Sequence, residues 1–283
     1  MSLYSHIKSI IEEKINDKTT VIAIHGASSS GKSTMGRSLK KILSQFLKVS
    51  LISLDTFYKD FTGEDITKYD LDNPDAIEWK NVHQVLSAYH NEEEKIPYWY
   101  RDFNSYRSYG PFFKENVKPQ IIIVEGMLAL NLFSEYEFTG FSAIDPSKGS
   151  ITRNNIKYPN FNVLKIKLNM CKSRMKHVKL IRDVKERGSK TEVASQQFET
   201  QVWPGTEKWI EHEIFSEADF ILVHGTFNKI GYKTLLEAIS EAFTGIATFE
   251  NCITTQIDTI PCEGDCYIKH ANGFIILDSH ISS

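Results

Sequence analysis

The chain has 283 residues, of which 41% are hydrophobic and 24% charged, so it can build a sizeable core and is not a disordered polymer. Its 33 Lys and Arg against 36 Asp and Glu give a net charge of −3, which excludes an overall basic field that would recruit nucleic acid or an anionic membrane. The start lacks a secretory signal pattern, no apolar run approaches the roughly 20 residues that cross a bilayer, and four Cys do not make a disulfide framework. We therefore expect a soluble, cytoplasmic protein.

Along the first 245 residues, short apolar runs alternate with stretches of helical spacing, a pattern typical of a parallel sheet covered on both faces. We predict an α/β fold of the P-loop, doubly wound type, with a mostly parallel sheet of five strands at 21–24, 49–54, 121–124, 163–168 and 220–223. Apolar residues at helical spacing predict helices at 3–16, 33–47, 81–90, 170–187, 191–214 and 232–243. In the fifth of these, the proline of Trp203-Pro204 is expected to break or kink the helix.

Other stretches depart from this alternation. Residues 58–80 are polar and irregular, and residues 96–100 are compatible with an edge strand. Residues 139–161, rich in Gly, Pro, Asn and Ser, are predicted as a loop insertion. Beyond about residue 246 the composition changes to Thr, Ile, Cys, Gly and Asp with period-two stretches. We therefore predict a domain over 1–245 and a small β-rich extension over 246–283, for which no role is predicted.

Residues 26–33, Gly-Ala-Ser-Ser-Ser-Gly-Lys-Ser, fit the phosphate-binding pattern G-x-x-x-x-G-K-[ST] in full and stand between a predicted strand and a predicted helix. Glycines let the backbone curl so that N–H groups converge on phosphate oxygens, and the helix presents its positive end to the same anion. Lys32 is expected to neutralise the β- and γ-phosphates, and the Ser33 hydroxyl to ligate Mg²⁺. We predict a binding site for ATP, or GTP, made of Gly26, Ala27, Ser28, Ser29, Ser30, Gly31, Lys32, Ser33 and Thr34.

Two carboxylates stand at the ends of predicted strands. Asp55 follows the strand at 49–54, and Glu125 follows the strand at 121–124. Because ligands of a doubly wound sheet bind beyond the carboxyl ends of its strands, both side chains should point toward the phosphate loop. A carboxylate there can hold Mg²⁺ or accept a proton from an attacking hydroxyl. The alternative is that each one only caps the turn that follows it.

A run of cations at helical spacing precedes Gly188 and predicts a mobile basic lid over about residues 176–190. The cations of this run are Lys176, Lys179, Arg182, Lys185 and Arg187. Arg182 and Arg187 suit a lid because the guanidinium group binds phosphate with two parallel hydrogen bonds and stays charged. The alternative is an ordinary solvated helix face.

Two other classes of phosphate-loop protein fit the sequence less well. A GTPase switch is disfavoured because the Asp-x-x-Gly at 60–63 does not directly follow a strand, and the Asn-Lys-Ile-Gly at 228–231 lacks the Asp that would recognise guanine. ATPase motors usually end the second carboxylate strand in Asp-Glu, whereas this chain has Glu125-Gly126.

These residues, with further motifs between about 20 and 240, resemble the uridine kinase (uridine–cytidine kinase) family. Asp55-Thr-Phe-Tyr58 is similar to the family's D-x-F-Y, Leu71-Asp-Asn-Pro-Asp-Ala76 to its F-D-H-P-D-A, and Gln197-Phe-Glu-Thr-Gln-Val-Trp-Pro204 to its Q-Y-x-x-x-V-x-P. Further matches in the same order are Ile96-Pro97, Asp102-Phe103, Val124-Glu125-Gly126, Ile181-Arg-Asp-Val-Lys-Glu-Arg-Gly188 and Ala218-Asp219.

The resemblance implies a role for each matching residue. Ser33, Asp55 and Glu125 would hold magnesium, and Asp55 would also be the catalytic base. Asp72 and Lys179 would hold the ribose, while Gln197 and an aromatic residue near Tyr100 would contact the base. The implied catalytic set is Asp55, Lys32, Arg182 and Arg187, and the implied substrate-binding set is Tyr58, Asp72, Tyr100, Tyr106, Lys179 and Gln197.

The implied reaction transfers the γ-phosphoryl group of ATP to the 5′-hydroxyl of uridine or cytidine, a step of pyrimidine salvage. The expected partner is a small nucleoside rather than nucleic acid or membrane, and a homo-oligomer stays open. The family's base-contacting His aligns with Tyr106 and a base-contacting Arg with Ser189, so base recognition is altered. Val202-Trp203-Pro204 also resembles nicotinamide riboside kinases, which keeps another riboside or small metabolite open as the substrate. A nucleotide-binding switch without kinase activity is the alternative from a different class.

Four residues of the extension have metal-ligand chemistry. They are Cys252, Cys262, Cys266 and His270. Their spacing matches no zinc ribbon, and cysteine is commonly just a small buried residue, so a metal here stays open. Cys171, at the start of the lid helix, is expected to be structural.

Overall fold

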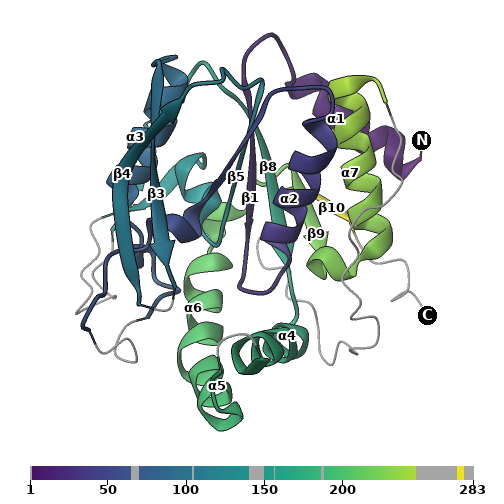
Figure 1. Ribbon diagram of the computed structural model, residues 1–283. Helices are drawn as coiled ribbons and strands as arrows, with labels where there is room; N and C mark the ends of the chain where they lie inside the picture. Colours follow the sequence, from purple (N-terminus) through teal and green to yellow (C-terminus); the bar gives the residue numbers. More distant parts are fainter. Residues whose placement is uncertain are drawn as a thin grey trace.

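The computed structural model describes residues 2–64, 70–103, 105–139, 150–155, 157–185, 188–246 and 273–276. A six-stranded sheet with helices on both faces forms its centre (Figure 1), in the strand order β10-β9-β8-β1-β5-β2. All neighbouring strands of this sheet pair in parallel. The strands are β1 (Thr20–Gly26), β2 (Val49–Ser53), β5 (Ile121–Gly126), β8 (Asn162–Asn169), β9 (Phe220–Val223) and β10 (Phe274–Ile276). The predicted parallel α/β fold is confirmed.

The sheet has one strand more than the five predicted. β10 belongs to the stretch predicted as a separate extension, yet it pairs in parallel with β9, with Phe274 beside Phe220. Its Ile276 side chain is buried, and the Ile276 carbonyl accepts a hydrogen bond of 3.2 Å from Asn228 Nδ2 at the start of α7 (Lys229–Thr244). Three residues are too few for periodicity to define a strand, so only its pairing with the domain reveals it.

Different helices cover the two faces of the sheet. One face is covered by α1 (Leu3–Lys14), α2 (Lys32–Leu43) and α7. The other is covered by α3 (Trp79–His90), the 3₁₀ helix η4 (Ala129–Leu132) and residues 198–215. Ile22 and Ile24 of β1 enter the first core, whereas Val21 and Ala23 enter the second. Burial on both faces explains why β1 is an unbroken apolar run.

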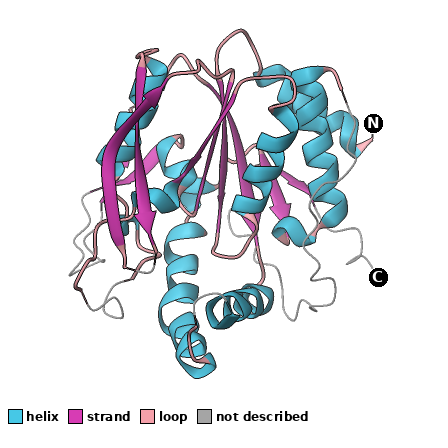
Figure 2. Cartoon of the chain, viewed as in Figure 1, coloured by secondary structure: helices cyan, strands magenta, loops and turns pink. Residues whose placement is uncertain are grey.

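Two antiparallel hairpins lie outside the central sheet, and Figure 2 shows the larger one as a pair of long strands at the left. It pairs β3 (Lys95–Asp102) with β4 (Arg107–Glu115). The strand suggested at 96–100 therefore exists, but its partner is β4, which the sequence did not predict. The smaller hairpin pairs β6 (Tyr136–Thr139) with β7 (Ser150–Arg153), so residues 139 and 150–153 of the predicted loop belong to strands rather than to irregular chain.

Of the two effects predicted for Pro204, a break or a kink, the break is wrong. After α4 (Lys172–Lys185), one helical run continues from Thr191 to Ile210. It consists of α5 (Thr191–Gln197), a π-helical turn η6 (Phe198–Val202), α6 (Trp203–Gly205) and a second π-helical turn η7 (Thr206–Ile210). A π turn bonds each N–H five residues back, and this wider winding on both sides accommodates the proline without ending the run.

Nowhere in the described residues does a helix combine the length and hydropathy that a membrane span needs.

Candidate functional site

The phosphate loop joins β1 to α2 at the carboxyl edge of the sheet, where the sequence predicted it. Gly31 has a φ of 96°, and a Cβ there would collide with the Thr226 side chain, so the loop requires glycine at this position. The Ser29 and Ser30 hydroxyl oxygens are buried and have no hydrogen-bond partner. Buried hydroxyls normally have one, so these two fit a ligand rich in acceptor oxygens, such as a nucleotide phosphate.

Lys32 lies over this loop and is buried, and its Nζ donates a hydrogen bond of 2.6 Å to the Ala27 carbonyl. Burial lowers the pKa of Lys32, and the nearby negative charges of Asp55 and Glu125 act in the opposite direction. Those two carboxylates therefore help to keep the ammonium charged. Arg182 of α4 reaches the same loop, with Nη2 3.4 Å from the Ser28 Oγ.

Ser33, Asp55 and Glu125 come together as predicted for a magnesium site. The Ser33 Oγ donates a hydrogen bond of 3.0 Å to Glu125 Oε2. Asp55 lies in the 3₁₀ helix η1 (Leu54–Phe57), directly after β2, and β2 is the hydrogen-bonded neighbour of β5, which ends in Glu125. Burial and the charge of Asp55 raise the pKa of Glu125.

The set offers two carboxylates and a hydroxyl, which are oxygen ligands of the type that Mg²⁺ prefers. No group of three His, Cys, Asp or Glu side chains forms a closed metal site in the described residues. A magnesium ion held here would therefore take its other ligands from phosphate and water, as is usual where it serves a nucleotide.

Asp72 is a buried carboxylate close enough to Lys32 for their charges to interact. Burial, followed by the charge of Asp70, raises its pKa to about 7, and the cations Lys179, Lys32 and Arg182 limit that rise. Lys179 is itself buried and donates a hydrogen bond of 2.6 Å to Asp183 one helical turn along α4. The predicted ribose-holding pair, Asp72 and Lys179, thus lies beside the predicted phosphate-binding cations.

The helical run 191–210 packs against Asp72. A Cβ on Gly205 would stand 3.0 Å from the Cβ of Asp72, so these two backbones approach closely. Three residues further on, Lys208 lies near Asp70, and Trp209 hydrogen-bonds to the Asp70 carboxylate. Neither Gly205 nor Asp70 was predicted, because the contact joins parts of the chain more than 130 residues apart.

Buried polar contacts fix the end of this run to β1, which leads into the phosphate loop, and to the neighbouring strand β8. His25, the residue before the loop, donates from Nε2 to the Ile210 carbonyl at 2.9 Å, and burial lowers its pKa well below the ordinary value. Beside it in the sheet, Lys167 forms a buried ion pair of 2.9 Å with Glu211. Sequence reasoning missed these residues, although a lysine inside the apolar run 163–168 was a usable signal, since a buried lysine needs a partner.

The remaining predicted site residues are placed less centrally. Tyr58 is close to Asp55 and Asp72, whose charges together with burial raise its pKa. Tyr100 is 58% exposed, and its ring lies 6.1 Å from that of Tyr109 at a tilt of 32°. Its neighbour Arg101 turns inward and donates to the Tyr58 and Lys59 carbonyls at 3.0 and 2.7 Å.

Tyr106 occupies the β3–β4 turn, and Gln197 is exposed at the end of α5. Base contact by Tyr100, Tyr106 and Gln197 therefore stays a prediction. Of the lid cations, Lys176 binds Glu199 at 2.8 Å, and Arg187 lies outside the described residues. The tail residues Cys252, Cys262, Cys266 and His270 also lie outside them. Cys171 is buried, as expected for a structural residue.

Comparisons with known proteins agree with the motifs. Residues 21–136 match the model of the phosphoribulokinase/uridine kinase family. The chain is 27% identical over 229 residues to a uridine kinase of Schizosaccharomyces pombe, covering 78% of this chain and 44% of that protein. It is 28% identical over 233 residues to a uridine kinase of Aeromonas hydrophila, covering 80% and 96%. The predicted resemblance is confirmed.

The alignments also set limits. The chain spans between 24% and 54% of the length of four curated relatives that it matches. Among solved structures, a proposed fructose transport system kinase from Silicibacter sp. TM1040 superposes with a TM-score of 0.52 at 17% identity, covering 75% of this chain and 94% of that one. At that identity the likeness supports the fold alone.

Proposed function

Because this chain resembles the phosphoribulokinase/uridine kinase family, we propose that it is a kinase that transfers the γ-phosphoryl group of ATP to the 5′-hydroxyl of a nucleoside. Uridine and cytidine are the first candidate acceptors, which would give the protein a role in cytoplasmic pyrimidine salvage. One observation carries the proposal: the phosphate loop, the two strand-end carboxylates and the buried Asp72 surround the same ammonium group, that of Lys32.

Each of these residues has a role in phosphoryl transfer, which mainly requires positioning and charge neutralisation. Ser33, Asp55 and Glu125 would hold Mg²⁺, which supplies charge neutralisation on the phosphate oxygens when it is bound. Lys32 and Arg182 lie at the loop and would stabilise charge that spreads over the transferred group. Asp55 would accept the proton of the acceptor hydroxyl. Asp72 would hold the acceptor by hydrogen bonds, aligning that hydroxyl with the phosphoryl group.

The test is a panel of nucleosides and ribosides assayed with ATP and Mg²⁺, following both ADP and the phosphorylated product. We expect kcat/KM to be highest for a nucleoside or another riboside, and expect Lys32→Met to abolish turnover. Lys41→Met, an exposed substitution on the same helix, is the matched control and should leave turnover unchanged. If ATP binds but no phosphorylated product forms with any acceptor, the kinase proposal is wrong and a nucleotide-binding switch becomes the better account.

Base selection is the part of the proposal with least support from the family, because Tyr106 and Ser189 replace two residues that contact the base in its members. A site that loses hydrogen-bonding groups discriminates poorly between substrates. We therefore expect weak discrimination between uridine and cytidine, with another riboside as the alternative preferred acceptor. Tyr106→His combined with Ser189→Arg should raise kcat/KM for pyrimidine nucleosides. A thousandfold preference of the unmodified protein for uridine would contradict this expectation.

A further inference from the structure

A cavity of about 780 Å³ lies at the end of β8 that points away from the phosphate loop. Its walls come from the chain after η4, from the residues around Tyr158, and from the first half of β8, where Val163 and Lys165 line it. The other end of β8 reaches the phosphate loop, since Leu168 pairs with Gly26. Lys165 is three residues before Leu168, so at about 3.3 Å per residue the two places lie roughly 10 Å apart along the strand.

Aromatic rings form much of one wall. Phe133, Tyr158 and Phe161 all line the cavity. The Tyr158 and Phe161 rings lie 5.7 Å apart at an interplanar angle of 24°, and Phe133 lies 6.3 Å from Tyr158. The Tyr158 hydroxyl is fixed by His83 Nδ1 at 2.7 Å, so this wall does not depend on a ligand for its shape. Pre-positioned rings of this kind favour a planar ligand that stacks on them.

Two residues that line the same cavity carry buried polar atoms without a hydrogen-bond partner, Ser134 Oγ and Asn154 Oδ1. The Asn154 amide nitrogen donates to the Leu132 carbonyl at 3.2 Å, which leaves the amide oxygen as an acceptor. A buried acceptor without a donor costs free energy, and a ligand N–H group would remove that cost. A ligand that carries a hydrogen-bond donor is therefore favoured over one that does not.

The cations around the cavity are each paired with a carboxylate. Arg153 lies 3.6 Å from Glu135, Lys157 lies 3.0 Å from Glu137, and Lys165 lies 3.9 Å from Glu217. Because positive and negative side chains balance, the cavity has no excess charge that would favour a phosphate or carboxylate ligand.

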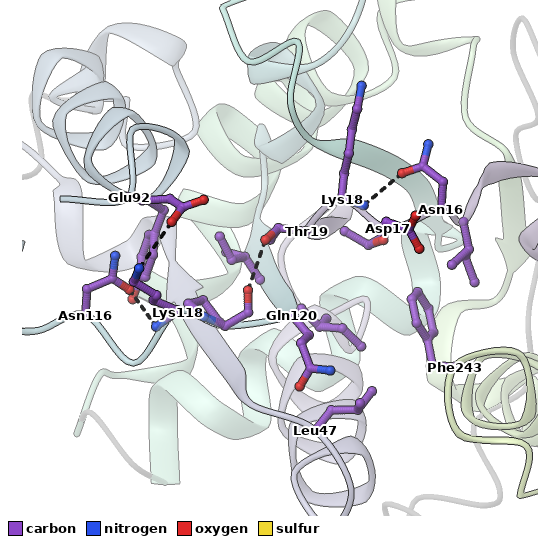
Figure 3. A pocket seen from close by; sticks show the side chains of 16 residues that line it. Asn16, Asp17, Lys18, Thr19, Leu47, Glu92, Asn116, Lys118, Gln120 and Phe243 are labelled. Atoms are coloured by element: carbon purple, nitrogen blue, oxygen red, sulfur yellow. Dashed lines mark hydrogen bonds and ion pairs between the residues drawn. The ribbon is translucent and has the colours of Figure 1, made fainter. Parts of the chain in front are cut away.

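We propose that this cavity binds an uncharged, planar nitrogen heterocycle that carries N–H groups. Another hollow among the described residues, of about 460 Å³, differs from this cavity (Figure 3). There the polar groups bind one another: Lys118 pairs with Glu92 at 3.3 Å, and the Asn116 side chain both donates to the Glu93 carbonyl and accepts from the Lys118 N–H. None of the unpartnered buried side-chain atoms of the described residues belongs to that hollow.

Calorimetric titration of the full chain with adenine tests the proposal, with and without excess ATP. Adenine has a planar ring and N–H donors, and a ligand of its size should bind with a Kd on the order of 0.1–1 mM. Asn154→Leu removes the acceptor and should weaken adenine binding about tenfold. Methylating every N–H group of adenine removes the donors and should weaken binding to the wild type by a similar factor. Val163→Trp fills the cavity and should abolish binding. Asn116→Leu, in the hollow of Figure 3, is the matched control and should bind as the wild type does.

Thermal unfolding of each variant identifies any variant that fails to fold. If one of the two cavity variants, Asn154→Leu or Val163→Trp, does not fold, the other is sufficient to test adenine binding. Adenine affinity that falls with Asn154→Leu or Val163→Trp, is unchanged by ATP and persists in Asn116→Leu supports the site. Absence of adenine binding to the wild type, competition by ATP, or wild-type affinity in the folded cavity variants would overturn it.

Discussion

Replacing Asp72 by Asn is expected to make the folded protein more stable at alkaline pH while it weakens acceptor binding. The carboxyl has an ordinary pKa of 3.8, which burial and Asp70 raise to about 7 in the folded chain. Between these values the folded state holds a proton that the unfolded state has released, so stability falls as the pH rises. At 1.36 kcal/mol per pH unit, the ionised Asp72 destabilises the folded state by about 4 kcal/mol above pH 7, and by almost nothing below pH 4.

The assay is thermal unfolding of wild type and Asp72→Asn at pH 4.5 and pH 8.5. We expect the variant's midpoint to gain about 5–10 °C relative to the wild type at pH 8.5, at about 2 °C per kcal/mol, and to gain much less at pH 4.5. The matched control is Asp75→Asn, whose carboxylate is in an ion pair of 2.8 Å with Lys59 and whose removal should give no such gain. If Asp72→Asn destabilises the protein equally at both pH values, the carboxylate is a structural partner and the argument from burial is refuted.

Three further substitutions test the site. Asp55→Asn should lower kcat by roughly 10²–10⁴ while ATP still binds, and near-normal turnover would remove Asp55 from the chemistry. Gly205→Ala places a Cβ 3.0 Å from the Cβ of Asp72 and should displace that carboxylate. Steady-state kinetics should show a several-fold higher KM for the acceptor with an unchanged KM for ATP. Equal rises in both KM values would indicate general disruption of the site. Lys167→Met leaves the buried Glu211 without its counter-ion and should cost about 3–5 kcal/mol of unfolding free energy in a denaturant titration; adding Glu211→Leu should restore most of it.

The parts of the site that lie on regular strands could be predicted from the sequence. Asp55 and Glu125 follow neighbouring parallel strands, so their meeting at one edge of the sheet is a consequence of topology. The phosphate loop has a local signature, since Gly31 adopts a backbone conformation that few other residues tolerate. These features depend on short-range pattern or on strand direction, which the sequence expresses directly.

Features that depend on pairing between distant segments could not be predicted. Which face of β3 points inward is decided by its register with β4, which shifts between Tyr98 and Tyr100. That shift leaves Tyr100 exposed and Arg101 buried, whereas residue type alone suggests the reverse. β10 and the contact of Gly205 with Asp72 were missed for the same reason, because neither has a periodic pattern of its own.

The titratable groups at the carboxyl edge of the sheet share one property that links stability to function. Burial disfavours the charged form of Lys32, Asp72 and Glu125 alike, so each of them destabilises the fold when ionised near neutral pH. The two apolar cores on either side of the sheet must offset this cost, since nothing else in the described residues buries comparable apolar surface. For these three groups the cost falls where a nucleotide, a metal ion and an acceptor would meet, and perturbed pKa values at such a place are typical of groups that serve chemistry.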